Sequence, residues 1–377
     1  MRIFSLLSAI LLLLNVNLQA QKNKLFPFKI NGSINVDTGT IQLKLLVDKE
    51  YYPEGVQNLR AKIINKKFFF RGYIPYPQGI QLSYGAGYLS NSFIIAPGTQ
   101  SIILNIDSNR KVPEVQNLVM KEYYSDYIHA FKEINLKSDK LYQKWDSLNI
   151  LFHRKIPEKI KLDLEKTRNE YYGESDKTLL QYVASHPNSY VAFWKFIELC
   201  SFSGYENIFD SILSQFSDSL KNTYTGKVLS NKLKIASKLG FGKKFPSINC
   251  INIQNKKLDP TSFLKNEYTL VDLWYSNCGP CIAQFPDLKN LYEKYKGKGF
   301  EIVGVSTDKV KYKTDWQNAI KKHQLVWPQY WDINGQEAAK LSINAFPTNF
   351  LLDSRGIIIK KNLRPPELKQ FLLENIK

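Results

Sequence analysis

Two cysteines separated by two residues, Cys278 and Cys281, are the residues in this sequence whose types and spacing most directly indicate chemistry. They follow an apolar run, residues 268–275, that is typical of a buried strand, and they precede a pattern typical of a helix. The first turn of a helix holds the two sulfur atoms of a Cys-x-x-Cys pair within bonding reach, so the pair can alternate between dithiol and disulfide. The sequence therefore predicts thiol–disulfide exchange.

The two cysteines are expected to have different roles. With Asn277 as the N-cap, the free N–H groups and the positive end of the helix dipole point at Cys278 and lower the pKa of its thiol. The thiolate is the attacking species, so Cys278 is the predicted nucleophile. Cys281 lies on the same helix face and deeper, which makes it the resolving cysteine. Pro280 fits the first turn of a helix, where no backbone N–H is needed.

Asp272 stands in the middle of the apolar run before the dithiol. An unpaired carboxylate in a buried strand is costly, and its pKa is expected to rise. One interpretation is a general base that accepts the proton of Cys281, directly or through water. The other is a structural carboxylate that is hydrogen-bonded to the backbone. The sequence leaves both open.

The surrounding chain divides into regions that differ in the spacing of their apolar residues. We expect a signal peptide at 1–20, an antiparallel β domain at 21–110, a helical linker domain at 111–240 and an α/β domain at 241–377. Period-two alternation predicts these strands in the β domain: Phe28–Ile34, Thr40–Val47, Lys67–Ile74, Gly79–Tyr84, Ser92–Ala96 and Gln100–Ile106. Apolar residues three and four apart predict these helices in the linker: Val115–Phe131, Lys137–Phe152, Lys159–Tyr172, Asp176–Ala184, Tyr190–Cys200 and Asn207–Leu220.

The α/β domain is expected to alternate strands and helices around a central sheet. Its predicted strands after the dithiol are Phe300–Ser306, Thr348–Leu352 and Ile357–Lys361, and its predicted helices are Cys281–Tyr295, Asp315–His323 and Glu367–Asn375.

The first 20 residues predict export. Arg2 supplies a positive start, Ile3–Leu14 an apolar core, and Leu18–Ala20 a small-residue cleavage site, so we expect a periplasmic protein, with an uncleaved N-terminal membrane anchor as the alternative. Four cysteines in 377 residues do not form a disulfide scaffold. Cys200 and Cys250 are expected to be incidental thiols, with a bridge between them as the alternative.

The net charge of +18 raises the question of nucleic-acid binding. The lysines are scattered as single residues and short pairs, and the sequence contains no nucleic-acid recognition motif, so we expect no nucleic-acid partner. A basic surface allows peripheral association with anionic lipid or with an acidic partner.

Three separated motifs carry a family resemblance. They are Val271-Asp-Leu-Trp-x-x-x-Cys-Gly-Pro-Cys281, then Ile282-Ala-Gln-Phe-Pro286, then Phe346-Pro-Thr-x-Phe-Leu-Leu-Asp353. In this order they resemble the thioredoxin fold, and within it the exported TlpA/ResA-like thiol-disulfide oxidoreductases. The resemblance implies a thioredoxin-like C-terminal domain. The front of the chain, with Lys67–Gly72 and Ala96–Gly98, resembles the β domain of unknown function that precedes such domains in Bacteroidota.

The resemblance also implies the site. Pro347 should be a cis-proline packed against the dithiol, with Phe346 pairing to the substrate chain, and Trp274, Gly279 and Pro280 should complete the substrate-binding surface. Partners would be protein thiols and disulfides and a membrane-bound electron donor, and no cofactor is implied. The Gly-Pro dipeptide resembles reducing thioredoxins. Asn277 departs from the family, which has an aromatic residue before the first cysteine.

Three other functions fit the sequence less well. Structural zinc needs four ligands, and neither a second Cys-x-x-Cys nor a nearby histidine pair exists, so we expect no metal. A thiol peroxidase would need a hydroxyl three residues before Cys278, where Tyr275 stands. A binding or assembly protein with an accessory thioredoxin-like domain would use the aromatic residues of the β domain, which are more typical of a core.

Overall fold

The computed structural model describes residues 24–107, 111–203, 205–259, 261 and 265–376. The predicted signal peptide lies outside this part of the chain. The chain forms two compact units, one that runs to His129 and adds Ser189–Trp194, and one made of Ala130–Asn188 and Lys195–Lys377. The predicted domain boundaries at 110 and 240 stay predictions. Within the described residues, no helix combines the length and the apolar character that a bilayer crossing requires.

The first unit is built around one sheet of nine strands within the described residues, in the order β6-β5-β2-β3-β4-β1-β8-β9, with β7 also paired to β5. The strands are β1 (Phe26–Ile34), β2 (Thr38–Leu45), β3 (Leu59–Ile64), β4 (Lys67–Ile74), β5 (Gln78–Tyr84), β6 (Tyr88–Leu89), β7 (Phe93–Ile95), β8 (Gly98–Leu104) and β9 (Glu114–Gln116). The predicted β domain is confirmed as an antiparallel-rich sheet. The exception is β1, which pairs in parallel with β8.

Two features of this sheet differ from the sequence prediction. β3 was not predicted, although its sequence Leu59-Arg-Ala-Lys-Ile alternates apolar and charged residues, and neither was the two-residue strand β6. The predicted helix Val115–Phe131 begins later, because Glu114–Gln116 instead forms β9 and pairs with β8. Helix α2 (Leu118–Glu122) starts after Asn117, whose side chain accepts a hydrogen bond from the Met120 N–H.

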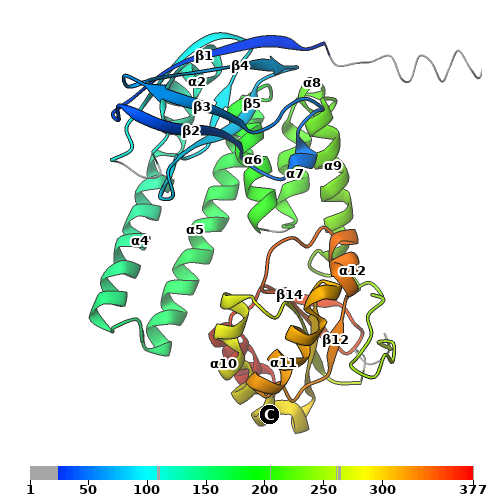
Figure 1. Ribbon diagram of the computed structural model, residues 1–377. Coiled ribbons are helices and arrows are strands. Elements are labelled where there is room, and N and C mark those ends of the chain that lie inside the picture. The colour runs from blue at the N-terminus through cyan, green and yellow to red at the C-terminus, as the bar shows by residue number, and fades with distance from the viewer. Residues whose placement is uncertain (1–23, 108–110, 204, 260, 262–264, 377) are drawn as a thin grey trace, which may run out of the picture. The chain divides into compact units, whose positions relative to one another are not determined.

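The predicted helical region is confirmed, with different boundaries. Its helices are α4 (Lys132–Leu151), α5 (Glu158–Ser185), α6 (Tyr190–Ser203), α7 (Ile208–Gln215), α8 (Asp218–Lys221) and α9 (Tyr224–Ala236). α4 and α5 lie side by side (Figure 1). The predicted separation of the helices Lys159–Tyr172 and Asp176–Ala184 is wrong, since α5 continues through Gly173; an interior glycine costs a helix only about 1 kcal/mol. The predicted helix 207–220 is divided, because Ser217 caps a new helix, α8.

The C-terminal domain has a second sheet, of five strands in the order β12-β11-β10-β13-β14. The strands are β10 (Tyr268–Trp274), β11 (Phe300–Ser306), β12 (Gln329–Trp331), β13 (Thr348–Asp353) and β14 (Ile358–Lys361). β10 pairs in parallel with β11 and antiparallel with β13, so it lies at the centre of the sheet. The sequence prediction did not include β12, which has only three residues, and it also missed the helices α9 and α12 (Gln336–Lys340).

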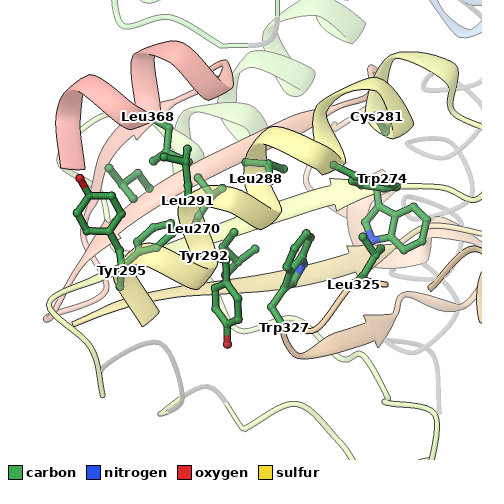
Figure 2. Close-up of a cluster of buried hydrophobic side chains, with 14 of the residues drawn as sticks. Leu270, Trp274, Cys281, Leu288, Leu291, Tyr292, Tyr295, Leu325, Trp327 and Leu368 are labelled. Atoms are coloured by element: carbon green, nitrogen blue, oxygen red, sulfur yellow. The ribbon is translucent and has the colours of Figure 1, made fainter. Parts of the chain in front are cut away.

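Both faces of this sheet are covered. The helices are α10 (Gly279–Tyr295), α11 (Lys313–His323), α12 (Gln336–Lys340) and α13 (Pro365–Asn375). Leu288 of α10 and Leu368 of α13 pack with Leu270 of β10 on one face, as Figure 2 shows. On the other face, Val271 and Leu273 pack with the segment around Phe245 and with Ala338 of α12. This arrangement explains the continuous apolar run of β10, because a strand buried on both faces has no polar side.

Candidate active site

The two cysteines of the predicted redox pair lie where β10 turns into α10. They form a disulfide with a Cα–Cα distance of 5.2 Å. Cys278 itself is the N-cap of α10, and its sulfur accepts a hydrogen bond from the N–H of Cys281 at 3.2 Å. The prediction that Asn277 is the N-cap was therefore wrong by one residue. This position favours the thiolate form of Cys278, because a free amide of the helix N-terminus points directly at the Cys278 sulfur.

Exposure does not separate the two cysteines in this disulfide form. Cys278 and Cys281 are each 1% exposed, so the prediction that Cys281 lies deeper is not supported. Their neighbours Asn277, Gly279 and Pro280 are exposed and frame the disulfide. What distinguishes Cys278 is its position at the helix N-terminus. A nucleophilic role for Cys278 therefore depends on the helix and not on greater accessibility.

Asp272 is buried in the centre of β10 and is 2% exposed. Successive side chains of a strand alternate between faces, so Asp272 shares a face with Leu270 and Trp274. Those two residues belong to the same buried cluster as Cys278 and Cys281. The Oδ1 atom of Asp272 has no hydrogen-bond partner, and burial raises the pKa of Asp272 to about 7. A carboxyl group in this state can exchange a proton near neutral pH.

Trp274 is fully buried beneath the dithiol. Figure 2 shows it near Cys281, at the start of α10. Its indole N–H donates to Gln329 Oε1 at 3.1 Å, and its ring meets Phe285 edge-on at 5.2 Å. Gly304 makes room for this contact, because a β-carbon there would lie 2.3 Å from Gln329 Oε1. Trp274 is 0% exposed, and its predicted role in substrate binding stays a prediction.

The loop before β13 supplies the other predicted substrate-binding residues. The Phe346–Pro347 peptide bond is cis, as the resemblance implied. Both residues are half-buried, and the Phe346 ring meets Tyr275 edge-on at 5.7 Å. Tyr275 lies three residues before Cys278, so this contact brings the cis-proline loop to the turn that carries the dithiol. The role of Phe346 and Pro347 in substrate binding stays a prediction.

Asp308 is a component of the site that the sequence analysis did not identify. It follows β11, is 4% exposed, and accepts hydrogen bonds from the N–H of Ser276 at 2.9 Å and from the hydroxyls of Ser276 and Ser306 at 2.7 Å each. Ser276 stands two residues before Cys278. Asp308 therefore fixes the turn that presents the nucleophile. The sequence could have indicated Asp308, because it stands just beyond the predicted strand 300–306 and parallel strands end at the same edge of a sheet.

Comparisons with known proteins bear on this arrangement. The family model described as Redoxin matches residues 241–371. The thiol-disulfide oxidoreductase ResA of Bacillus thuringiensis subsp. konkukian is 29% identical over 140 residues, which cover 37% of this chain and 79% of that protein. A solved thioredoxin domain of a thiol-disulfide oxidoreductase from Bacteroides vulgatus is 31% identical, with a TM-score of 0.34, over 36% of this chain and 98% of that one. A thiol-disulfide oxidoreductase from Bacteroides fragilis is 32% identical, with a TM-score of 0.32, over 35% of this chain and 98% of that one.

Through residues 241–371, the chain belongs to the redoxin family, and this part of it is similar to the thiol-disulfide oxidoreductase ResA. The predicted enzyme class and the thioredoxin-like fold of this domain are confirmed.

The redoxin dithiol contrasts with the two remaining cysteines. Cys200 and Cys250 are free thiols, so the alternative of a bridge between them is not found. Burial raises the pKa of both, well above the ordinary value for Cys200. Such thiols stay protonated and are poor nucleophiles. Within the described residues, no group of three or more His, Cys, Asp or Glu side chains could hold a metal ion.

Proposed function

We propose that this protein is an exported reductase of protein disulfides that uses Cys278 and Cys281 as its redox pair and Asp272 as the proton acceptor. One observation carries the proposal. A disulfide at a helix N-terminus and a buried carboxyl group with a pKa near 7 occupy the same face of one sheet. That combination supplies both the nucleophile and the base that disulfide reduction requires.

In the first step, the Cys278 thiolate attacks one sulfur of a substrate disulfide. The Cys278–substrate S–S bond forms, the substrate S–S bond breaks, and the other substrate sulfur leaves as a thiolate, which takes a proton from solvent. The N–H of Cys281 donates to Cys278 Sγ, and this contact stabilises the attacking thiolate.

In the second step, Asp272 accepts the proton of the Cys281 thiol. The Cys281 thiolate then attacks Cys278 Sγ, the Cys278–Cys281 disulfide forms, and the second substrate sulfur leaves reduced. The substrate gains two electrons and the dithiol loses two. Burial keeps the Asp272 carboxyl able to accept this proton near neutral pH and to return it to solvent when the site opens.

Each turnover leaves the enzyme oxidised, so a donor of two electrons must regenerate the dithiol. The Gly279-Pro280 pair supports the reducing direction, and the sequence of residues 1–20 supports export to the periplasm, where a membrane-bound thiol donor would meet this domain. The substrate is a protein disulfide in the same compartment.

The test uses the full mature chain in a disulfide-reduction assay with insulin and dithiothreitol, together with Cys278→Ser and Cys281→Ser. The wild type should accelerate reduction, Cys278→Ser should be inactive, and Cys281→Ser should accumulate mixed disulfides visible by mass spectrometry. Export is tested separately, by cell fractionation and N-terminal sequencing of the mature chain. Wild-type protein that binds partners but never accelerates reduction would support the accessory-domain alternative.

A further inference from the structure

The segment from the end of β11 to the first residue of α11 carries three lysines at alternate positions, Lys309, Lys311 and Lys313. Val310 and Tyr312 stand between them and are 57% and 37% exposed, in a 3₁₀ turn at Val310–Tyr312. Large side chains so exposed are common singly on a protein surface, but here they are interleaved with cations in five consecutive residues. The loop therefore presents a mixed apolar and basic surface.

Hydrogen bonds hold this loop next to the dithiol. Asp308, the residue before it, bonds to the N–H and the hydroxyl of Ser276, two residues before Cys278. The N–H of Val310 donates to Asn334 Oδ1 at 3.0 Å, and the indole N–H of Trp331 donates to the Asp308 carbonyl at 2.7 Å. Because a chain extends at most about 3.5 Å per residue, Val310 lies within about 7 Å of the Asp308 backbone.

The neighbouring turn adds apolar surface to the same edge. Tyr275 is 37% exposed and contacts Phe346, the residue before the cis-proline. Ile333, beside the Asn334 that bonds the loop, is 36% exposed. We call Tyr275, Phe346, Ile333 and the loop Lys309–Lys313 the docking rim.

The positive charge of the docking rim is not neutralised by ion pairs in the part of the chain that the structure describes. The Lys311 ammonium lies 4.7 Å from the centre of the Tyr312 ring, and the Lys313 ammonium lies 5.3 Å from that of Trp331. These contacts orient the two cations without cancelling their charge. Of the nearby acids, Asp308 is buried beneath its three hydrogen bonds, and Asp315 follows in the first turn of α11.

We propose that the docking rim binds an acidic protein segment that flanks the substrate disulfide. The inference rests on the proposed function and specifies its substrate: aspartate and glutamate side chains face the three lysines, and apolar side chains cover Tyr275, Val310 and Tyr312. Complementary charge raises the rate at which partners meet and disfavours partners of the same charge. The disulfide of the bound segment then lies at Cys278, and exchange proceeds by the two steps described above.

The test compares two synthetic peptides that share one intramolecular disulfide, flanked in one by three aspartates and in the other by three lysines. The variant is Lys309→Glu/Lys311→Glu/Lys313→Glu in the full mature chain. The matched control, Lys294→Glu/Lys296→Glu/Lys298→Glu, makes the same charge change with the same spacing. All three are exposed: Lys294 lies at the far end of α10, about 24 Å along the helix from Cys278, and Lys296 and Lys298 follow in a 3₁₀ turn.

We expect the wild type to reduce the acidic peptide at least about tenfold faster than the basic one, in kcat/KM at low salt, and 0.5 M NaCl to remove most of the difference. The loop variant should reverse the preference, with the effect mainly in KM, and the control variant should keep it. Equal rates for the two peptides in the wild type, or an equal loss in both variants, would overturn the inference.

The neutral disulfide of 2-mercaptoethanol separates this inference from the proposed function. The wild type and the control variant should reduce it at equal rates, and the rate of the loop variant on it is the reference by which that variant's two peptide rates are divided. If the wild type fails on this small disulfide as well as on both peptides, the proposed reductase function fails. If it succeeds on the small disulfide but ignores peptide charge, only the docking rim is wrong.

Discussion

The two sheets of this protein bury different kinds of polar group. In the N-terminal sheet, β4 alternates exposed and buried residues, and the buried polar residues of this unit are neutral. Gln100 is an example: its amide bonds to the backbone of Ala96 and to Asn117. The C-terminal sheet is buried on both faces and encloses the carboxyl groups of Asp272, Asp308 and Asp332.

The difference indicates where the chemistry lies. A buried neutral amide is stable once it is hydrogen-bonded, whereas a buried carboxylate needs several donors or a proton. Asp308 has three donors, and Asp272 Oδ1 has none. The C-terminal sheet therefore holds one carboxyl group that positions the turn and one that can titrate. In the first unit, the structure describes no buried carboxyl group.

The largest effect is expected at the dithiol itself. Cys278→Ser should lower the rate of disulfide reduction by at least about a thousandfold, because no other described thiol is the N-cap of a helix. Cys250→Ser is the matched control and should retain full activity, since Cys250 is a buried free thiol. The insulin assay measures both. Substantial activity in Cys278→Ser would mean that the contrast between the two kinds of cysteine is false.

The next effect is expected at Asp272. Asp272→Asn should slow resolution of the mixed disulfide by about a hundredfold at pH 7. A group must be ionised to accept a proton, so the wild-type rate should rise with pH through the Asp272 pKa of about 7 and then level off. The variant should lose this inflection. Stopped-flow measurement of resolution between pH 5.5 and 8.5 tests both, and an unchanged profile in the variant would assign Asp272 a purely structural role.

A smaller effect is expected at Asp308. Asp308→Asn removes a buried negative charge near the dithiol, so the thiolate form is disfavoured less and the disulfide is easier to reduce. The equilibrium constant for reduction of the Cys278–Cys281 disulfide by glutathione should rise about tenfold. This corresponds to an increase of about 30 mV in the reduction potential of this two-electron couple.

Asp332→Asn is the control for this comparison. Asp332 is also buried, but it accepts hydrogen bonds from the N–H groups of Glu337 and Ala338 in α12 and bonds to no residue of the turn. It should change the equilibrium at most about twofold, while both variants lose some thermal stability. Equal redox shifts in the two variants would show that Asp308 has no special position.

The smallest effect on activity is expected in the N-terminal sheet. A β-carbon at Gly79 would lie 2.6 Å from the Trp194 ring, so Gly79→Ala should destabilise the first unit by about 1–3 kcal/mol. Gly87→Ala meets no atom within 4 Å and serves as the control. Hydrogen exchange in β5 should increase in Gly79→Ala alone, and both variants should reduce the neutral disulfide at the wild-type rate. A slower rate in Gly79→Ala would show that the two units are coupled.

Much of the fold could be predicted because its signals are local. The alternation in Lys67–Ile74 placed β4 to the residue, and the run before the dithiol placed β10 to within one residue. The errors came where context outweighed local preference. Gly173 lies within the long helix α5, and Glu114–Gln116 joins the sheet as β9.

The sequence by itself determined the redox pair, because two cysteines, a stiff Gly-Pro link and a strand-to-helix transition lie within one short segment. It also marked Asp272 as out of place. Only the tertiary structure decided what surrounds them: Asp308 is 32 residues from Ser276, and Gln329 is 55 residues from Trp274. Such contacts depend on which strands become neighbours and in what register, and periodicity along the chain does not contain that information.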